Sequence, residues 1–460
     1  MNIFWHQRDL RIPDNCGLAA AASEDTTLPV YLVDPELRER LGTRQWAFFL
    51  NGVRRLKEQY RELGSDLLVR DGDPVETLGE IAADHDADCI YYNRHYRPIR
   101  RERQQRVDDA FSTEAVTDLT LVDPAALDSR YPSHSQFYND WQAVAKPAPA
   151  AAPGSDALAD VVDDAPVPEA EPKVDIELPE AGYRAARRRY DRFLSDGIES
   201  YNDSRDDMTA AVDRPIGAVS RLSPYIAAGM IGIRELWADA TERHAAVSGD
   251  SSAARNVDKF RYELSWREQN YQLLSYNPNL PTENYKAIPN PIAWRNDTEE
   301  FAAWKRGETG YPLVDAGMRQ LEAEGYIHNR PRQNVASFLT KHLLVDWREG
   351  ADYFAEKLVD HDPANNSANW QWIASTGTDT VDVRIFDPVA QMAKYDDDAV
   401  YVTEYVPELR GVDAGKIVDW PNLSSEERAE LAPEYCEPIV DRNEAYERAQ
   451  RVFEEALGKR

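Results

Sequence analysis

The chain has 460 residues, of which 42% are hydrophobic, so it is long enough for two or three domains with substantial cores. A formal net charge of −29 argues against a generally basic nucleic-acid binder, and three scattered cysteines argue against a disulfide framework and a zinc site. No run of 18 apolar residues and no N-terminal leader is present, so we expect a cytoplasmic protein without a membrane span.

Residues 1–140 alternate short apolar runs with helical patterns. The runs at 3–5, 30–33, 67–70 and 89–92 predict buried strands, and residues 44–63 carry apolar side chains at helical spacing. Strands that alternate with helices are typical of a Rossmann-like parallel sheet with helices on both faces. We therefore predict an α/β N-terminal domain over residues 1–140.

Residues 141–180 differ in composition, because a run rich in proline, alanine and aspartate lacks periodicity and aromatic side chains. Such a segment is typical of a solvated inter-domain linker. Residues 181–460 are helical in pattern, with apolar side chains three and four residues apart at 264–274, 314–324 and 335–347. Eight of the 11 tryptophans lie beyond residue 230, so this mostly α-helical domain holds a large aromatic core.

Two clusters of basic residues stand out from the acidic background. Residues 97–106 hold five arginines, and residues 184–189 hold four. Each cluster fits either a positive groove on an acidic body or an ordinary solvated helix face.

The last third combines tryptophan with arginine, asparagine and aspartate in helical sequence. Arg330 and Arg332 lie beside amides, and Asp360 and Asp362 precede an asparagine-rich stretch that ends at Trp372. Buried charges must be paired, and an Arg332–Asp360 ion pair is one solution. A polar core in a helical domain suits a large cofactor with many hydrogen-bonding edges.

These segments resemble the flavin domain of the photolyase/cryptochrome family, especially the bacterial-type (class I) enzymes that act on cyclobutane pyrimidine dimers. The resemblance covers nearly the whole chain and implies light-driven repair of ultraviolet-damaged DNA by a monomeric lyase with reduced FAD as cofactor. The motifs that carry it are Trp5-His-Gln-Arg8-Asp9-Leu10-Arg11, Ser220-Arg221-Leu222-Ser223-Pro224-Tyr225, Glu263-Leu-Ser-Trp266-Arg267-Glu268 and Thr309-Gly-Tyr-Pro-Leu-Val-Asp315.

The resemblance implies a flavin site built from serine hydroxyls and backbone amides at the diphosphate. It also implies that Asn366 faces flavin N5, where its amide oxygen accepts a hydrogen bond that favours the reduced flavin. Taken alone, Ser220 and Ser223 would be read as helix caps. The implied flavin residues are Tyr201, Val219, Ser220, Arg221, Leu222, Ser223, Phe260, Arg267, Arg332, Asp360, His361, Asp362 and Asn366.

For the lesion, the resemblance implies a pocket that receives a flipped dimer. Trp266 would stack on the bases and Glu263 would hydrogen-bond their edges, so Glu263, Trp266 and Asn366 are the predicted catalytic residues. Trp266 alone would be read as a core residue. The implied DNA-binding residues are Arg205, Glu263, Trp266, Asn270, Asn329, Arg330, Arg384 and Gln391.

The resemblance further implies a tryptophan electron relay, with Trp370 nearest the flavin, Trp347 in the middle and Trp294 near the surface. Without the resemblance all three would be assigned to core packing. We assign Trp304 and Trp372 to the core.

Departures from the family pattern leave alternatives open. Gln333 stands where the dimer enzymes have methionine, and a glutamine there resembles the DASH cryptochromes, which motivates a reading restricted to single-stranded DNA. A second alternative is a cryptochrome-type photoreceptor, against which the intact lesion contacts argue. The stretch from Tyr96 to Arg101 lacks the asparagine–glutamate pair of folate-binding relatives, so an 8-hydroxy-deazaflavin antenna is favoured over methenyltetrahydrofolate.

Overall fold

A computed structural model describes residues 1–378 and 381–459, while Asp379, Thr380 and Arg460, all within the predicted helical domain, lie outside the described residues. By packing, the chain divides into two compact units. The N-terminal unit comprises Met1–Glu199, Arg221–Asn279 and Val359–Ala364, and the C-terminal unit comprises Ser200–Ser220, Leu280–Leu358 and Asn365–Arg460. The domain boundaries at 140 and 180 stay predictions.

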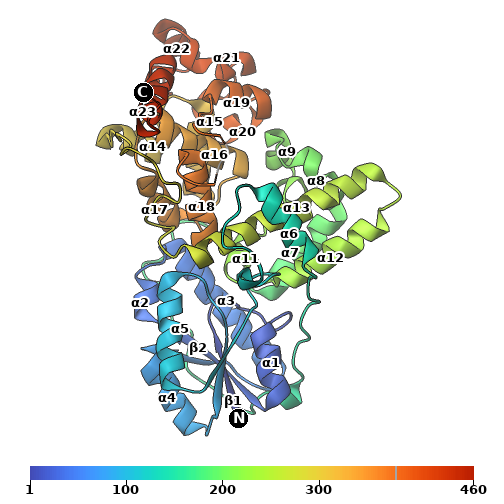
Figure 1. The fold of residues 1–460 in the computed structure, drawn as a ribbon. Helices are drawn as coiled ribbons and strands as arrows, with labels where there is room; N and C mark the ends of the chain where they lie inside the picture. The colour runs from blue at the N-terminus through green and yellow to red at the C-terminus, as the bar shows by residue number, and fades with distance from the viewer. Residues whose placement is uncertain (379–380, 460) are drawn as a thin grey trace. The chain divides into compact units, whose positions relative to one another are not determined.

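The N-terminal unit is built on a five-stranded parallel sheet of order β3-β2-β1-β4-β5, which confirms the predicted α/β fold (Figure 1). The first two strands are buried along their whole length, as expected for a sheet covered on both faces. The strands are β1 (Asn2–His6), β2 (Thr27–Val33), β3 (Leu68–Asp71), β4 (Cys89–Asn93) and β5 (Thr113–Val116).

Four of these strands were predicted and β5 was not. Its sequence Thr-Glu-Ala-Val is short and polar, and its side chains are only partly buried, as is common at the edge of a sheet. Apolar runs therefore located the central strands but not the last edge strand.

Helices cover the sheet, with α1 on one face and α4 and α5 on the other (Figure 1). The predicted helix at 44–63 is α3, whose Trp46, Phe49, Val53 and Leu56 are buried at spacings of three and four residues. The helices of this part are α1 (Cys16–Glu24), α2 (Pro35–Arg38), α3 (Thr43–Glu62), α4 (Pro74–Asp84), α5 (Pro98–Ala110) and α6 (His134–Ala143).

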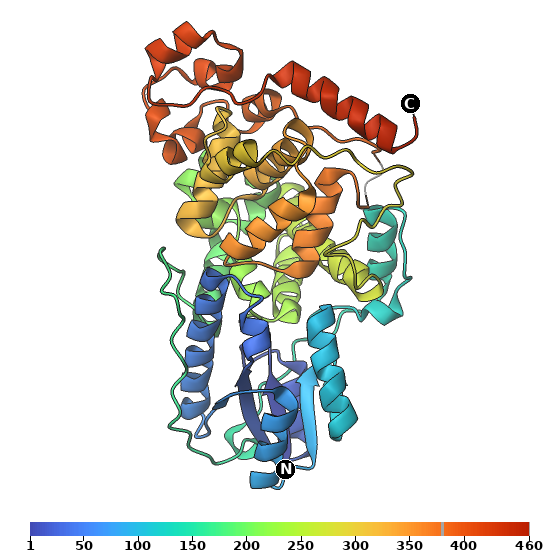
Figure 2. The same ribbon diagram turned by 90° about the vertical axis from the view of Figure 1, so that its left-hand side faces the viewer.

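The segment at 141–180 contains little regular structure, as predicted, but it is not fully solvated. It runs beside α3 (Figure 2) and is fixed at Asp163, whose carboxylate accepts hydrogen bonds from the Lys57 ammonium and the Val69 amide at 3.0 and 3.1 Å. Leu158 and Ala159 are buried against the sheet domain. The segment is therefore packed along its own unit.

Four further helices complete the N-terminal unit: α7 (Tyr183–Asp196), α11 (Ser223–Ala227), α12 (Ile233–Ala246) and α13 (Ser251–Tyr276). The predicted helix at 264–274 is the second half of α13, which has 26 residues and begins at the N-cap Asp250. Short one-turn helices of the unit are η1 (Pro124–Ala126), η2 (Ser155–Ala157) and η3 (Ile198–Ser200).

The C-terminal unit is helical and has a large aromatic core that contains Trp304, Trp347 and Trp370, and a second core that contains Tyr401, Trp420 and Tyr435. Its last helix, α23, is seen lengthwise in Figure 2. Its helices are α8 (Tyr201–Ser204), α9 (Met208–Asp213), α10 (Pro215–Ala218), α14 (Thr298–Arg306), α15 (Pro312–Glu324), α16 (Asn329–Ser337), η4 (Phe338–His342), α17 (Trp347–Lys357), α18 (Pro363–Ala374), α19 (Pro388–Tyr395), α20 (Val400–Tyr405), η5 (Pro407–Leu409), α21 (Ala414–Val418), η6 (Trp420–Asn422), α22 (Ser425–Leu431) and α23 (Arg442–Ala456).

The predicted helix at 314–324 is α15, but the prediction of a single helix at 335–347 is wrong. The chain there passes from α16 into the π-helix η4, which is capped by Leu343. The next helix, α17, begins only at Trp347. Leu344 adopts a left-handed conformation with φ 53°, and its carbonyl accepts a hydrogen bond from the Arg295 amide at 2.7 Å. The apolar spacing continues through this break because both sides face the same core. No helix in the described ranges is both long and apolar enough to cross a lipid bilayer.

Candidate functional site

The predicted flavin and DNA residues are divided between the two units. Each unit holds contacts that can be described within it. The N-terminal unit carries Arg221, Leu222, Ser223, Phe260, Glu263, Trp266, Arg267, Asn270, Asp360, His361 and Asp362, and the C-terminal unit carries Tyr201, Arg205, Val219, Ser220, Trp294, Asn329, Arg330, Arg332, Trp347, Asn366, Trp370, Arg384 and Gln391.

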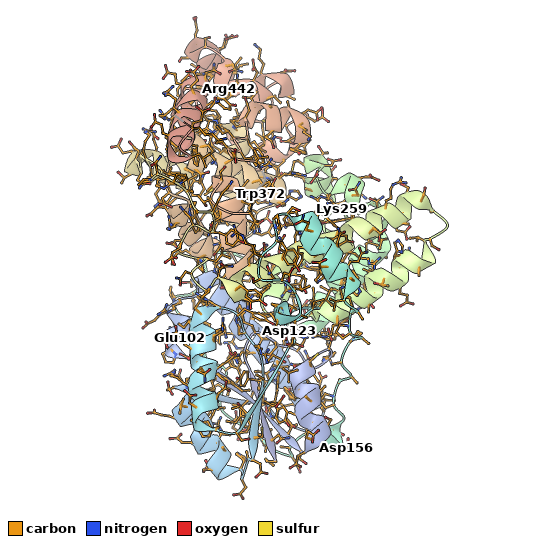
Figure 3. The ribbon with its side chains drawn as sticks, viewed as in Figure 1. Glu102, Asp123, Asp156, Lys259, Trp372 and Arg442 are labelled. Atoms are coloured by element: carbon orange, nitrogen blue, oxygen red, sulfur yellow. The ribbon has the colours of Figure 1, made fainter. Side chains whose placement is uncertain are left out.

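Helix α13 presents Glu263 and Trp266 one turn apart, because residues i and i+3 lie on the same face of a helix. Glu263 forms an ion pair with Lys259 at 2.7 Å (Lys259 is labelled in Figure 3), and its side chain is 28% exposed. Trp266 is partly buried. One face of its indole ring stacks on the imidazole of His134, with the ring centroids 3.6 Å apart and the planes 9° from parallel.

Arg267, the next residue on α13, makes its hydrogen bonds to the protein through Nη1 of its guanidinium. Its guanidinium donates to the Leu119 carbonyl at 2.8 Å and lies 4.6 Å from the Tyr271 ring centre. Its buried Nε has no hydrogen-bond partner among the described residues. A buried donor without a partner is expensive, so this atom fits a bound group that offers acceptor oxygens, as FAD does.

Asp362 is fixed inside the N-terminal unit by two donors. Arg8 forms an ion pair with its carboxylate at 3.1 Å, and the Tyr271 hydroxyl donates to the same oxygen. The His361 carbonyl beside it accepts from the Gln45 side chain at 2.5 Å. Asp360, His361 and Asp362 are all buried, so the aspartates are not solvated surface charges. The Arg332–Asp360 pair joins residues of different units and stays a prediction.

The remaining predicted flavin residues in the N-terminal unit are less specific. Phe260 packs against Phe193 with ring centroids 5.2 Å apart. Asn270, which is a predicted DNA-binding residue, is buried on the same helix. Arg221 adopts a left-handed conformation with φ 48°, which is uncommon outside glycine and is often retained at functional turns. Ser223 is exposed and is the first residue of α11, whose N-cap is Leu222, so Ser223 is not the N-cap of this helix.

Asn366 on α18 has its amide orientation fixed within the C-terminal unit. Its Nδ2 donates to the Ala351 carbonyl at 2.9 Å. The amide oxygen is therefore directed away from that contact and remains able to accept a hydrogen bond. This geometry fits the role implied for Asn366 at a protonated flavin nitrogen.

Two predicted DNA-binding arginines share one carboxylate in the C-terminal unit. The Arg205 guanidinium lies 3.2 Å from Asp206, and Arg330 forms an ion pair with the other oxygen of the same side chain. Burial opposes ionisation of Asp206, but Arg330 and Arg205 outweigh it and lower its pKa. Arg330 also donates to Gln333 at 3.1 Å, so the departure at 333 is in contact with a predicted DNA residue.

Trp372, labelled in Figure 3, was assigned to the core, and that assignment is only partly correct. Its side chain is partly buried, and the Arg384 guanidinium lies 4.5 Å from its ring centre. Asn329 at the start of α16 is exposed and Gln391 on α19 is partly buried. These four residues thus keep side-chain surface within reach of a ligand.

The relay tryptophans belong to one aromatic core. Trp347 and Trp370 are buried in it and Trp294 packs against it. A Cβ added to Gly350, one turn after Trp347 on α17, would lie 2.3 Å from Cη2 of Trp370, so the Trp370 ring closes directly onto this helix. The Trp347 indole donates to Asn284 at 2.9 Å. Trp304 is fully buried, which confirms its assignment to the core.

The arginines at 97–106 are divided between two environments, because Arg101 and Arg106 lie on a solvated face of α5 and Arg97 is partly buried. Arg100 and Arg103 are buried and line a narrow recess at the carboxyl ends of β1 and β2, together with Gln7 and Tyr31. Burial and the neighbouring arginines lower the pKa of Arg100, and burial also lowers that of Arg97 to about 10. The amide atoms of Gln7 are buried without partners among the described residues.

Three of the four arginines at 184–189 are exposed or partly exposed but paired with acids, and Arg189 lies over the Tyr225 ring. Arg184 pairs with Glu62, Arg187 with Glu235 and Arg188 with Glu180, the last two at 2.7 Å. A positive groove is therefore not built from this cluster. No group of three or more metal-ligating side chains occurs among residues 1–378 and 381–459.

Several residues of the site were missed from sequence. Arg8, Tyr271 and Asp206 hold predicted site residues, and His134 covers Trp266. Arg8 lies in a motif quoted for the resemblance, which was a usable signal. The other three carry no local pattern that distinguishes them.

Comparison with known proteins places these contacts in context. Residues 2–154 match the family described as DNA photolyase, and residues 260–455 match the FAD binding domain of DNA photolyase. A deoxyribodipyrimidine photo-lyase of Halobacterium salinarum is 43% identical, with 100% of both chains covered. The enzyme of the same name from Escherichia coli is 31% identical over 99% of this chain and 98% of its own.

Solved structures agree with the sequence matches. A bacterial class III photolyase from Agrobacterium tumefaciens superimposes with a TM-score of 0.87 at 32% identity, covering 100% of this chain and 98% of that one. An archaeal photolyase from Sulfolobus tokodaii, solved with two FAD molecules, gives a TM-score of 0.83 at 31% identity and covers 99% of this chain and 100% of its own.

Proposed function

The chain belongs to the DNA photolyase family, and from this premise we propose that it repairs cyclobutane pyrimidine dimers in DNA with light. The proposal rests on the arrangement of helix α13, which presents Glu263 and Trp266 one turn apart. Arg267 lies beside them, and its buried Nε has no hydrogen-bond partner among the described residues. One helix thus offers contacts of the kind that both a flipped pyrimidine dimer and a flavin require.

FAD, when bound and reduced, supplies the light-driven electron that opens the cyclobutane ring. The protein holds it through Arg267, whose buried Nε offers a hydrogen bond, and through the buried aspartates. Asp362 cannot reorient, because Arg8 and Tyr271 fix it. Asn366 presents its amide oxygen as an acceptor for a proton on flavin N5.

The dimer must leave the duplex to be reached, so the protein must bind a flipped lesion. Trp266 provides the aromatic surface for the bases, and Glu263 provides a carboxylate for their polar edges. Glu263 is paired with Lys259 in this structure and exchanges that partner for the lesion. Arg205, Arg330 and Arg384 contact phosphates around the flipped site.

Trp294, Trp347 and Trp370 pass electrons inward from the protein surface. Their common core and the closure of Trp370 onto α17 at Gly350 support this role. Trp370→Phe should abolish photoreduction of oxidised flavin in the purified protein, as measured by absorption under illumination with a thiol reductant. Unchanged photoreduction would contradict the relay.

A second chromophore in the recess lined by Gln7, Arg100 and Arg103 is supported by its unsatisfied buried donors. Arg100 has no carboxylate within ion-pair distance among the described residues, so an anionic group is favoured there. An 8-hydroxy-deazaflavin has an acidic ring hydroxyl that ionises to such a group. Mass spectrometry of chromophores released from the purified protein distinguishes it from a folate and from a second FAD, as in the Sulfolobus tokodaii photolyase.

A preference for single-stranded DNA is the second candidate. Gln333, the residue that resembles the DASH cryptochromes, contacts Arg330. A cryptochrome DASH of Natronomonas pharaonis is 32% identical, with 97% of this chain and 99% of its own covered. The test is illumination of the reduced protein with dimer-containing single- and double-stranded DNA at high salt. Repair of both supports the leading proposal, and repair of single strands alone supports this candidate. If neither kind of DNA is repaired, both repair proposals are wrong and the photoreceptor alternative remains.

A further inference from the structure

We propose that His134 is a positioning residue that holds the Trp266 indole in the orientation needed to stack on a flipped pyrimidine dimer. The inference rests on the proposed function, because it presumes that Trp266 contacts the lesion. It concerns a residue outside every motif discussed above. His134 is the first residue of α6, and both of its hydrogen-bond partners lie on α13.

The contact between the two rings is close and parallel. The ring centroids are 3.6 Å apart and the planes differ by 9°, so the imidazole lies flat against one face of the indole. Tyr262 meets both rings edge-on, with centroids 4.9 Å from His134 and 6.5 Å from Trp266. The part of Trp266 that remains exposed is then available to a base.

His134 is itself held firmly. Its Nδ1 lies 2.7 Å from Oε1 of Gln269, and its Nε2 lies 3.0 Å from Oγ of Ser265. Ser265 and Gln269 flank Trp266 on α13, one residue before it and three after it. Both ring nitrogens are thus hydrogen-bonded to the helix that carries Trp266, which fixes the plane of the imidazole relative to the indole.

The imidazole is neutral in this position. Burial lowers the pKa of His134 to about 4, against a smaller opposing effect of Glu263. A neutral ring stacks without adding a charge beside the lesion. An aromatic ring without charge should therefore replace His134 more successfully than a small side chain.

This arrangement matters because base stacking depends on ring orientation. A partly exposed tryptophan without a partner on its second face can rotate about χ1 and χ2, and fixing it on binding lowers the affinity. A ring already fixed by His134 avoids that loss. The effect should appear in the recognition of the dimer, not in general affinity for DNA, which depends on phosphate contacts.

The test compares four variants of the full-length flavin-bound protein in the dark: His134→Ala, His134→Phe, Trp266→Ala and His244→Ala. His244 is a partly exposed histidine of α12 that pairs with Asp258 and serves as the matched control. The measurement is fluorescence anisotropy with an oligonucleotide of one sequence, with and without a single thymine dimer. It gives the ratio of the dissociation constant for the undamaged oligonucleotide to that for the damaged one.

We expect His134→Ala and Trp266→Ala each to lower that ratio by about tenfold, since stacking contributes at this level. His134→Phe and His244→Ala should keep it within about twofold. The double variant His134→Ala/Trp266→Ala should lose no more than Trp266→Ala alone, because both changes remove the same contact.

Three outcomes would overturn the inference. If Trp266→Ala lowers the ratio and His134→Ala does not, the positioning role is wrong and the proposed lesion contact stands. If His134→Phe loses as much as His134→Ala, hydrogen bonds and not the ring stack are responsible. If Trp266→Ala itself leaves the ratio unchanged, the proposed lesion contact fails and the inference with it.

Discussion

Two arginine-containing regions of this acidic protein differ in every respect except charge. Arg100 and Arg103 lie close together in sequence and are buried inside the sheet domain. Arg205 and Arg330 are far apart in sequence and share Asp206 in the C-terminal unit, partly open to solvent. A run of basic residues therefore marks an interior site here, whereas the arginines proposed to contact DNA are single residues brought together by folding.

The difference also concerns neutralisation. Arg100 has no acidic partner among the described residues, so a bound anion would compensate its charge. Arg330 already has Asp206, so DNA must compete with a carboxylate inside the protein. An acidic protein in this way limits non-specific binding to nucleic acid while it keeps arginines available at one place.

The largest effect should follow removal of the buried charge. Arg100→Leu should abolish retention of the second chromophore, because Arg103, the other buried cation of the recess, is already paired with Asp34. The free energy of unfolding of chromophore-free protein should rise by about 1 kcal/mol or more, since an apolar side chain replaces an uncompensated buried charge. Absorption spectra and urea unfolding measure both effects.

Arg330→Leu is the matched control for that experiment. The Arg330→Leu variant should retain the chromophore, and its free energy of unfolding should not rise. A stabilised Arg330→Leu variant, or a retained chromophore in Arg100→Leu, would remove the distinction between the two regions.

A smaller effect is expected at the surface pair. Arg330→Ala should weaken binding to damaged and undamaged DNA alike, by about tenfold. The slope of the logarithm of affinity against the logarithm of salt concentration should fall by about 1, as expected for the loss of one phosphate contact. The check is a salt titration of DNA affinity. A loss confined to damaged DNA would show that Arg330 contacts the lesion and not the backbone.

Asp206→Asn should act in the opposite direction and more weakly. The change leaves Arg205 and Arg330 without their shared carboxylate, so affinity for undamaged DNA should rise by about threefold. Asp203→Asn on α8 is the control, because it removes the same charge from the same region. Equal effects of both variants would mean that net charge alone is responsible.

The smallest effect is a pH dependence of stability from the buried region. His95 is fully buried, and burial together with Arg100 and Arg8 lowers its pKa well below 6.5. Below pH of about 6.5 the unfolded chain therefore binds a proton that the folded chain does not, and stability falls as the pH decreases. His95→Asn should make this fall less steep in urea unfolding measured from pH 7 to pH 5. An unchanged slope would show that His95 is protonated in the folded protein.

Much of the fold was predictable because it depends on local patterns. The central strands are continuous apolar runs, and α3 and α15 carry apolar side chains at helical spacing. The break after η4 was not predictable, because Leu344 leaves the helix through its backbone conformation while its neighbours remain apolar. Periodicity reports which face is buried and not whether the helix continues.

The site was predictable in its residues and not in its contacts. The motif around Glu263 and Trp266 identified α13 as a functional helix. Nothing in that motif indicates that the second face of Trp266 is covered by His134, which lies on α6 of the same unit, far before it in sequence. Likewise, the cluster at 97–106 was visible as charge, but its burial depends on how α5 packs on the sheet.

Gly350 gives the relay a property that no polar contact provides. Because it has no side chain, the six-membered ring of Trp370 meets the backbone of α17 directly, one turn from Trp347. Electron tunnelling decays exponentially with the width of the gap between donor and acceptor. In the proposed relay, the absence of a single methyl group at position 350 would keep the gap between Trp370 and α17 narrow, and so speed the step that makes a light-driven charge separation permanent before it recombines.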